Sequence, residues 1–266
     1  MNKIGIMQGR FTEKGSFAPQ VFPEKVWEKE FYECARRGFA CIEWMFNFEN
    51  ALNNPLIIET KKVSEVINKS KVEVSGICCN YFMQSSLLNK SLLDHNINVF
   101  KSVLDAALAI GCKYIVIPLF EQSDISSANP KEIDNLIHFF SVYKSLSLQV
   151  LIESNLSADE YLTLLGNSIS NVGICYDIGN SAGLGRNVEN EIKELWKYIK
   201  NIHIKDKPLC GSSVMLGEGD ADFGGCLKTL REYDYSGCLI METYYNRAIE
   251  DTIKNYNYLL NVMEKV

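Results

Sequence analysis

The feature that most constrains the fold of this chain is a set of eight short apolar segments, spaced about 25 to 40 residues apart. They are rich in Ile, Val and Cys and lack strict apolar and polar alternation, which is typical of parallel strands buried on both faces. The predicted strands cover residues 4–7, 41–42, 72–79, 114–118, 149–152, 172–176, 202–204 and 238–241.

The segments between these strands carry apolar residues at helical spacing. One predicted helix starts near Pro23 and ends at Gly38, and another starts at Asn129-Pro130. Alternating strands and helices predict a parallel α/β fold, and eight units in 266 residues favour a (β/α)8 TIM barrel over an open doubly wound sheet. No Gly-rich phosphate loop follows the first strand, and no linker divides the chain, so we expect a single TIM-barrel domain over residues 1–266.

The composition of the chain excludes several functional classes. The chain has 27 Lys and Arg against 33 Asp and Glu, a net charge of −6 that would repel nucleic acid. Its nine cysteines form no C-x-x-C pair, its first residues do not resemble a signal peptide, and no apolar stretch is long enough for a membrane span. The sequence therefore predicts a cytoplasmic protein that binds neither nucleic acid nor membrane.

Polar residues follow the last four predicted strands directly. They are Glu153, Asp177, His203 and Glu242. The carboxyl ends of barrel strands meet at one face, where barrel enzymes carry their active sites. A single acid at a strand end is typical of a salt bridge or a helix cap, but four such residues at successive strands indicate one shared site.

Three neighbouring carboxylates would repel one another unless a cation lies between them. One nitrogen and several oxygens form a hard ligand set that favours Mn²⁺, with Mg²⁺ or Co²⁺ as alternatives, and Zn²⁺ also binds His and carboxylates. The sequence therefore predicts one divalent metal ion.

Several motifs in the second half resemble those of a known superfamily. They are Tyr176-Asp177-Ile178-Gly179-Asn180, Ile202-His203-Ile204-Lys205-Asp206, Leu216-Gly217-Glu218-Gly219 with Asp222-Phe223, and Ile240-Met241-Glu242. Their order is similar to that in the xylose-isomerase-like TIM barrels of sugar phosphate isomerases and epimerases, and most closely in the L-ribulose/L-xylulose 5-phosphate 3-epimerases. The resemblance implies a barrel over the whole chain, with Glu153, Asp177, His203 and Glu242 as metal ligands and a homo-oligomeric state.

Two positions depart from the free-ketose 3-epimerases of this superfamily, which carry a second His and an Arg there. This chain has Asn180 and Leu209 instead. The Asn agrees with the phosphopentulose branch, yet the two differences together leave the substrate open. We therefore expect 3-epimerisation of a ketose 5-phosphate. The alternatives are an isomerase or epimerase of a free ketose, hydroxypyruvate or an inositol-derived ketone.

Epimerisation beside a ketone needs a base on one face of the carbon and an acid on the other. Glu153 and Glu242 are the candidate catalytic pair, and an aldose–ketose isomerase could use the same groups. Arg10, Glu43 and Lys205 are candidates for substrate binding, because each lies at the end of a predicted strand or shares the facing of His203. Backbone amides in the 217–219 loop are candidates for binding phosphate.

Two further alternatives come from other classes. The superfamily includes endonucleases that bind several zinc ions through many histidines, but this chain has three histidines and an acidic charge. A barrel that binds a sugar without catalysis is the second, and the presence of both Glu153 and Glu242 argues against it.

Overall fold

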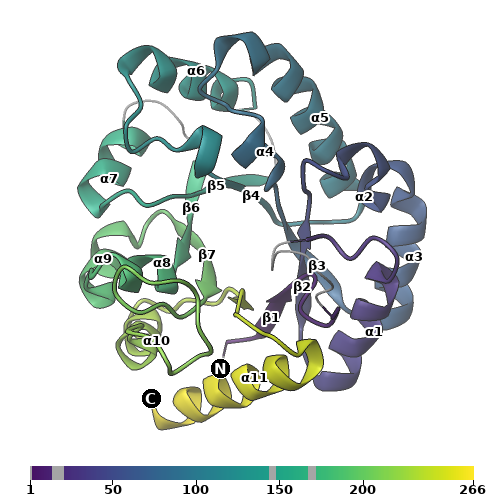
Figure 1. Ribbon diagram of the computed structural model, residues 1–266, viewed down its shortest axis with the longest axis vertical. Helices are drawn as coiled ribbons and strands as arrows, with labels where there is room; N and C mark the ends of the chain where they lie inside the picture. The colour runs from purple at the N-terminus through teal and green to yellow at the C-terminus, as the bar shows by residue number, and fades with distance from the viewer. Residues whose placement is uncertain (1, 14–20, 144–147, 167–171) are drawn as a thin grey trace. The chain divides into compact units, whose positions relative to one another are not determined.

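The computed structural model describes residues 2–13, 21–143, 148–166 and 172–266. Its eight parallel strands pair in chain order and the sheet closes as a barrel, because β8 pairs with β1 (Figure 1). The strands are β1 Ile4–Met7, β2 Cys41–Met45, β3 Glu73–Cys78, β4 Tyr114–Pro118, β5 Gln149–Glu153, β6 Val172–Asp177, β7 Ile199–Ile204 and β8 Leu239–Met241. All eight predicted strands and the (β/α)8 fold class are confirmed.

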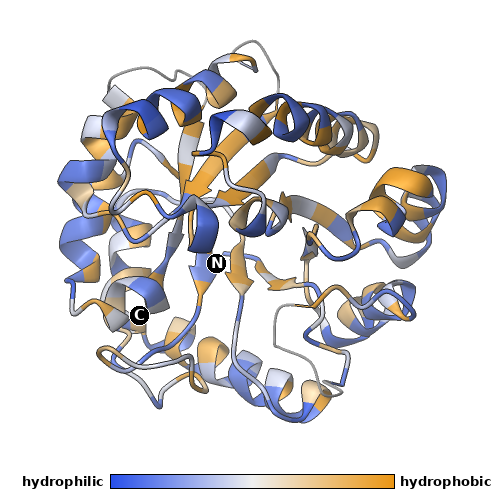
Figure 2. Ribbon diagram, turned by 45° about the horizontal axis from the view of Figure 1, so that its top comes forward, coloured by the Kyte–Doolittle hydropathy of each residue, from blue (hydrophilic) through white to orange (hydrophobic). Residues whose placement is uncertain are grey.

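Helices alternate with these strands along the chain. The α-helices are α1 Trp27–Arg37, α2 Pro55–Ile58, α3 Thr60–Ser70, α4 Tyr81–Gln84, α5 Leu93–Ala109, α6 Pro130–Ser141, α7 Ala158–Gly166, α8 Ile178–Gly183, α9 Val188–Leu195, α10 Phe223–Glu232 and α11 Ala248–Lys265. Short 3₁₀ helices lie at Ala51–Asn53, Lys90–Leu92 and Glu121–Ser123. The helices carry both hydrophilic and hydrophobic residues, as amphipathic helices on a sheet do (Figure 2).

Sequence signals at the helix ends act as expected. Gly38 adopts a left-handed conformation with φ of 81° and ends α1, although α1 begins at Trp27 and not at Pro23. Asn129 caps α6, and together with Glu132 it forms a capping box. Across the described residues, none of the helices is both long enough and apolar enough to cross a membrane.

Internal contacts divide the chain into two compact units. Unit 1 comprises Met1–Glu43 and Cys175–Val266. Within it, β7 pairs with β8, β8 with β1, and β1 with the first part of β2. Gly5 is needed in β1, because a Cβ there would lie 2.5 Å from Sγ of Cys41 and 2.6 Å from Cδ1 of Ile240. This close packing brings the carboxyl ends of β7, β8 and β1 together.

Unit 2 comprises Trp44–Ile174 and contains β3, β4, β5 and the first part of β6. Its helices α4, α5 and α6 pack through an aromatic cluster in which the ring of Phe82 contacts those of Phe100 and Phe139. In the sheet, β5 pairs with β4 on one side and with β6 on the other.

Candidate metal and catalytic site

Three of the predicted ligands converge within unit 1. Asp177 is the last residue of β6, His203 lies near the end of β7, and Glu242 directly follows β8. Each offers one ligand atom, and these atoms lie within 4.8 Å of one another. The side chains are buried, with exposed fractions of 5%, 0% and 6%. Unit 1 therefore brings one imidazole and two carboxylates to one point.

The fourth predicted ligand, Glu153, belongs to unit 2. It is the last residue of β5, it pairs with Pro118 of β4, and it is buried. Strand β5 is the neighbour of β6, the strand that ends in Asp177. Glu153 thus terminates the strand next to the one that carries a ligand of the cluster.

The imidazole of His203 lies between two carboxylates. Its Nδ1 is 2.8 Å from Oε2 of Glu242, and its Nε2 is 2.8 Å from Oε1 of Glu43. The other oxygen of Glu43 accepts a hydrogen bond of 2.8 Å from Nδ2 of Asn201. Glu43 therefore contacts the far side of His203.

The donor set fits a divalent cation. A carboxylate oxygen is a strong hydrogen-bond acceptor, so the contact with Glu43 is satisfied by a proton on Nε2 of His203. The remaining nitrogen, Nδ1, then faces Glu242 with its lone pair. A lone pair beside a carboxylate is unfavourable without a cation, and imidazole nitrogen with carboxylate oxygen is a ligand set for Mn²⁺, Mg²⁺, Co²⁺ or Zn²⁺.

Lys205 joins the same cluster. Its Nζ lies 2.8 Å from Oδ2 of Asp177 and 2.7 Å from Oε1 of Glu242. Burial alone would raise the pKa of Glu242, but the neighbouring charge of Lys205 holds it well below its usual range. Glu242 is therefore a carboxylate at neutral pH.

The stem of Lys205 packs against Gly179 at the start of α8. A Cβ at Gly179 would lie 2.8 Å from the backbone carbon and the Cγ of Lys205. Only glycine leaves room for this lysine, so the motif that follows Asp177 serves the packing of Lys205.

Arg10 contacts the backbone just after β8. Its Nε donates to the carbonyl of Thr243, the residue after Glu242, and its guanidinium lies 5.9 Å from the ring centre of Tyr245. Burial raises the pKa of Tyr245 to about 12, so this phenol stays neutral. Arg10 thus holds the backbone beside Glu242. Its role in substrate binding stays a prediction.

The loop after β7 is organised by a buried carboxylate that the sequence analysis assigned no role. Asp206 is 0% exposed and accepts hydrogen bonds from the backbone amides of Gly217, Gly219 and Ala221. These bonds occupy the two glycine amides, so the expectation that they bind phosphate is wrong. Asp222 in the same loop caps α10, because its side chain accepts from the Gly225 amide.

The outcome for the predicted site residues is therefore mixed. Lys205 does share the facing of His203, because both side chains contact Glu242. Glu43 contacts His203 and Asn201 with its two oxygens, a role that was not foreseen. The signal for Asn201 was the alternation Asn201-His203-Lys205, since residues at period two share one face of a strand.

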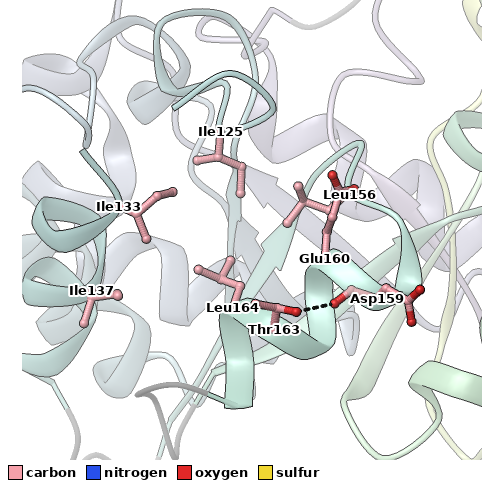
Figure 3. A pocket seen from close by; sticks show the side chains of 8 residues that line it. All are labelled: Ile125, Ile133, Ile137, Leu156, Asp159, Glu160, Thr163 and Leu164. Carbon is pink, nitrogen blue, oxygen red and sulfur yellow. Dashed lines mark hydrogen bonds between the residues drawn. The ribbon is translucent and has the colours of Figure 1, made fainter. Parts of the chain in front are cut away.

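A separate pocket of about 340 Å³ lies in unit 2, between α6 and α7 (Figure 3). Its walls are mainly apolar and its described lining contains no histidine, cysteine or cationic residue. The lining residues are Ile125, Ile133, Ile137, Leu156, Asp159, Glu160, Thr163 and Leu164. Glu160 is already engaged in capping α7, where it accepts from the amide and hydroxyl of Ser157.

Comparisons with known proteins find relatives in sequence and similar folds among solved structures. One relative is the putative L-ribulose-5-phosphate 3-epimerase SgbU of Escherichia coli strain K12, 35% identical over 85 residues, which are 29% of this chain and 30% of that protein. The chain thus covers less than a third of the length of this relative. Similar solved structures include a D-tagatose 3-epimerase-like protein, with a TM-score of 0.77, 18% identity and coverage of 99% and 98%. Another is the 3-keto-D-glucoside 4-epimerase YcjR of E. coli, with a TM-score of 0.73, 18% identity and full coverage of both chains.

These structural likenesses concern the fold. The match that decides membership spans residues 31–265, where the sequence fits the family described as xylose isomerase-like TIM barrel. The chain therefore belongs to the xylose isomerase-like TIM barrel family.

Proposed function

We propose that this protein is a divalent-metal-dependent sugar epimerase that inverts C3 of a ketose 5-phosphate. The observation that carries the proposal is the buried cluster of Asp177, His203 and Glu242 at the carboxyl ends of β6, β7 and β8. One nitrogen and several carboxylate oxygens suit a metal that binds a sugar through its oxygens. Sugar epimerases among the relatives support the same reaction class.

The residues that would hold the cation are Glu153, Asp177, His203 and Glu242. Glu153 is assigned by strand order, because it ends the strand next to β6. A bound Mn²⁺ would polarise the ketone and a neighbouring hydroxyl oxygen and so acidify the C3–H bond. Mg²⁺, Co²⁺ and Zn²⁺ are the alternatives.

The two glutamates would carry the proton. Glu242, a carboxylate at neutral pH because of its lowered pKa, removes the proton from C3. The C–H electron pair forms the C2–C3 double bond of an enediolate, and the ketone π electrons move to oxygen. Glu153 in its protonated form then delivers a proton to the opposite face of C3, and the ketone forms again with inverted configuration. The reverse reaction exchanges the roles of the two residues.

Lys205 would stabilise this arrangement. Its ammonium group is held between Asp177 and Glu242, so a positive charge lies where the carboxylate must stay ionised. The same donor is close enough to the cluster to bind a substrate oxygen, which is the role proposed for it.

A second candidate is epimerisation of an unphosphorylated ketose. It is favoured by the engagement of the Gly217 and Gly219 amides with Asp206, which removes the candidate phosphate contact of that loop. The phosphorylated substrate is favoured by the partial identity to the L-ribulose-5-phosphate 3-epimerase relative.

Substrate choice is tested by kcat/KM for ketopentoses and ketohexoses with and without a terminal phosphate. A phosphate bound by even one charge-assisted hydrogen bond should raise kcat/KM by about 10- to 100-fold. We expect this advantage for the ketose 5-phosphates. Equal kcat/KM for a sugar and its phosphate would select the second candidate.

We also propose that residues 1–266 form a single domain, that the protein is cytoplasmic and that it is a homo-oligomer. These proposals rest on the sequence pattern and on the family resemblance. Analytical ultracentrifugation of the purified chain measures its oligomeric state.

A further inference from the structure

We propose that Glu43 is a positioning residue that fixes the imidazole of His203 in the orientation needed for metal binding. This proposal rests on the metal site proposed above and adds a residue that is not itself a ligand. Glu43 would hold the proton on Nε2, so that Nδ1 presents its lone pair to the cluster.

Both ends of this contact are fully buried. Glu43 and His203 are each 0% exposed, and Oε1 of Glu43 lies 2.8 Å from Nε2 of His203. Oε2 of Glu43 accepts from Asn201, which is itself 1% exposed. The carboxylate is therefore held in a defined orientation from two sides.

The backbone of Glu43 is also fixed. It pairs with Met7 in the sheet, and its carbonyl accepts from the amide of Gln8. Side chain and backbone together anchor the glutamate between β1 and β7, so the contact with His203 is built on rigid strands.

Burial of a carboxylate is costly, and apolar residues of similar size often stabilise a core better than a buried ion pair does. A glutamate at this place is thus poorly explained by stability alone. It is explained if the imidazole needs a strong acceptor on the side opposite its ligand atom. Such partners orient the ring, raise its basicity and change metal affinity by about 10- to 100-fold.

The first test is the affinity of Glu43→Gln for Mn²⁺, measured by titration calorimetry on the full chain. Glutamine has the same shape but lacks the negative charge, so we expect Kd to rise about 10- to 100-fold. The matched control is Glu191→Gln, which removes a buried carboxylate that binds Tyr176 and Ser181 instead of a histidine. Its Kd should stay close to that of the wild type, because Glu191 does not contact a proposed ligand.

The second test measures by NMR which ring nitrogen of His203 carries the proton. The chain has only three histidines, so a long-range ¹⁵N–¹H correlation spectrum of the Zn²⁺-loaded protein is simple to assign. In the wild type, the ring proton of His203 should be on Nε2 and shifted downfield by the carboxylate. Glu43→Gln should move this signal upfield, and Glu191→Gln should leave it in place. A purely structural role for Glu43 would not change it.

A third variant provides an independent test in case Glu43→Gln does not fold. Asn201→Ser keeps Glu43 but removes the amide that holds its second oxygen. We expect an affinity between those of the wild type and Glu43→Gln, and thermal melts of all metal-free variants establish that they are folded. If Glu43→Gln does not fold, the Asn201→Ser result decides.

Unchanged Mn²⁺ affinity and an unmoved Nε2 proton signal in the folded variants would overturn the positioning role. A wild type that binds no divalent metal would overturn it as well. A wild type that binds metal in a Glu43-dependent way but epimerises no ketose would leave the positioning role standing and would refute the proposed function. The two proposals can therefore fail separately.

Discussion

Replacement of Glu242 by Gln is expected to lower the epimerisation rate by about 10²- to 10⁴-fold, the usual contribution of a positioned acid or base. Glutamine keeps the size of the side chain but cannot remove the C3 proton. The loss should appear in kcat under saturating Mn²⁺, with bound metal measured by elemental analysis, because Glu242 is also a proposed ligand. The control is Glu250→Gln on α11, an exposed glutamate paired with Arg247, which should leave kcat unchanged.

Solvent isotope exchange separates the two proposed bases. With Glu242→Gln, deuterium should still enter C3 of the epimer whose proton Glu153 removes, without inversion. With Glu153→Gln, exchange should be confined to the other epimer. Inversion at full rate in both single variants would contradict the two-base scheme.

Removal of the cation by a chelator is expected to abolish activity and to lower the melting temperature. A ligand present at 100 times its Kd stabilises the native state by about 2.7 kcal/mol, which corresponds to roughly 5 to 10 °C for a chain of this size. Return of Mn²⁺ to the desalted protein should restore both. The metal-free chain should stay folded, since Lys205 already balances the carboxylates of Asp177 and Glu242.

The same titration with Mg²⁺, Co²⁺ and Zn²⁺ ranks the metals by recovered kcat. Full activity in protein that contains no metal by elemental analysis would remove the cation from the proposed mechanism.

The barrel could be predicted from the sequence because its strands are short, apolar and evenly spaced. Apolar runs did not mark the full length of a strand where that strand contains a polar residue. Strand β2 runs to Met45 and β7 begins at Ile199, so Glu43 and Asn201 lie inside strands that the apolar runs had cut short. Their side chains are buried at the site, which the hydropathy pattern does not convey.

The hydrogen-bond partners of the site residues could not be predicted from the sequence either. The ends of β6, β7 and β8 meet by topology, so Asp177, His203 and Glu242 could be grouped from the sequence. The contact of Glu43 with His203 joins residues 160 positions apart. Its existence depends on side-chain register, which a single sequence does not reveal. The same is true of Asp206, whose three backbone partners become defined only when the loop is folded.

The central claim is that this chain moves a proton at C3 of a ketose. It is tested most directly by NMR detection of deuterium uptake from D₂O into ketose 5-phosphates and free ketoses, with the Mn²⁺-loaded protein. We predict deuterium at C3 and the appearance of the C3 epimer. Deuterium at C1 alone, or no exchange into any ketose with metal bound, would contradict it.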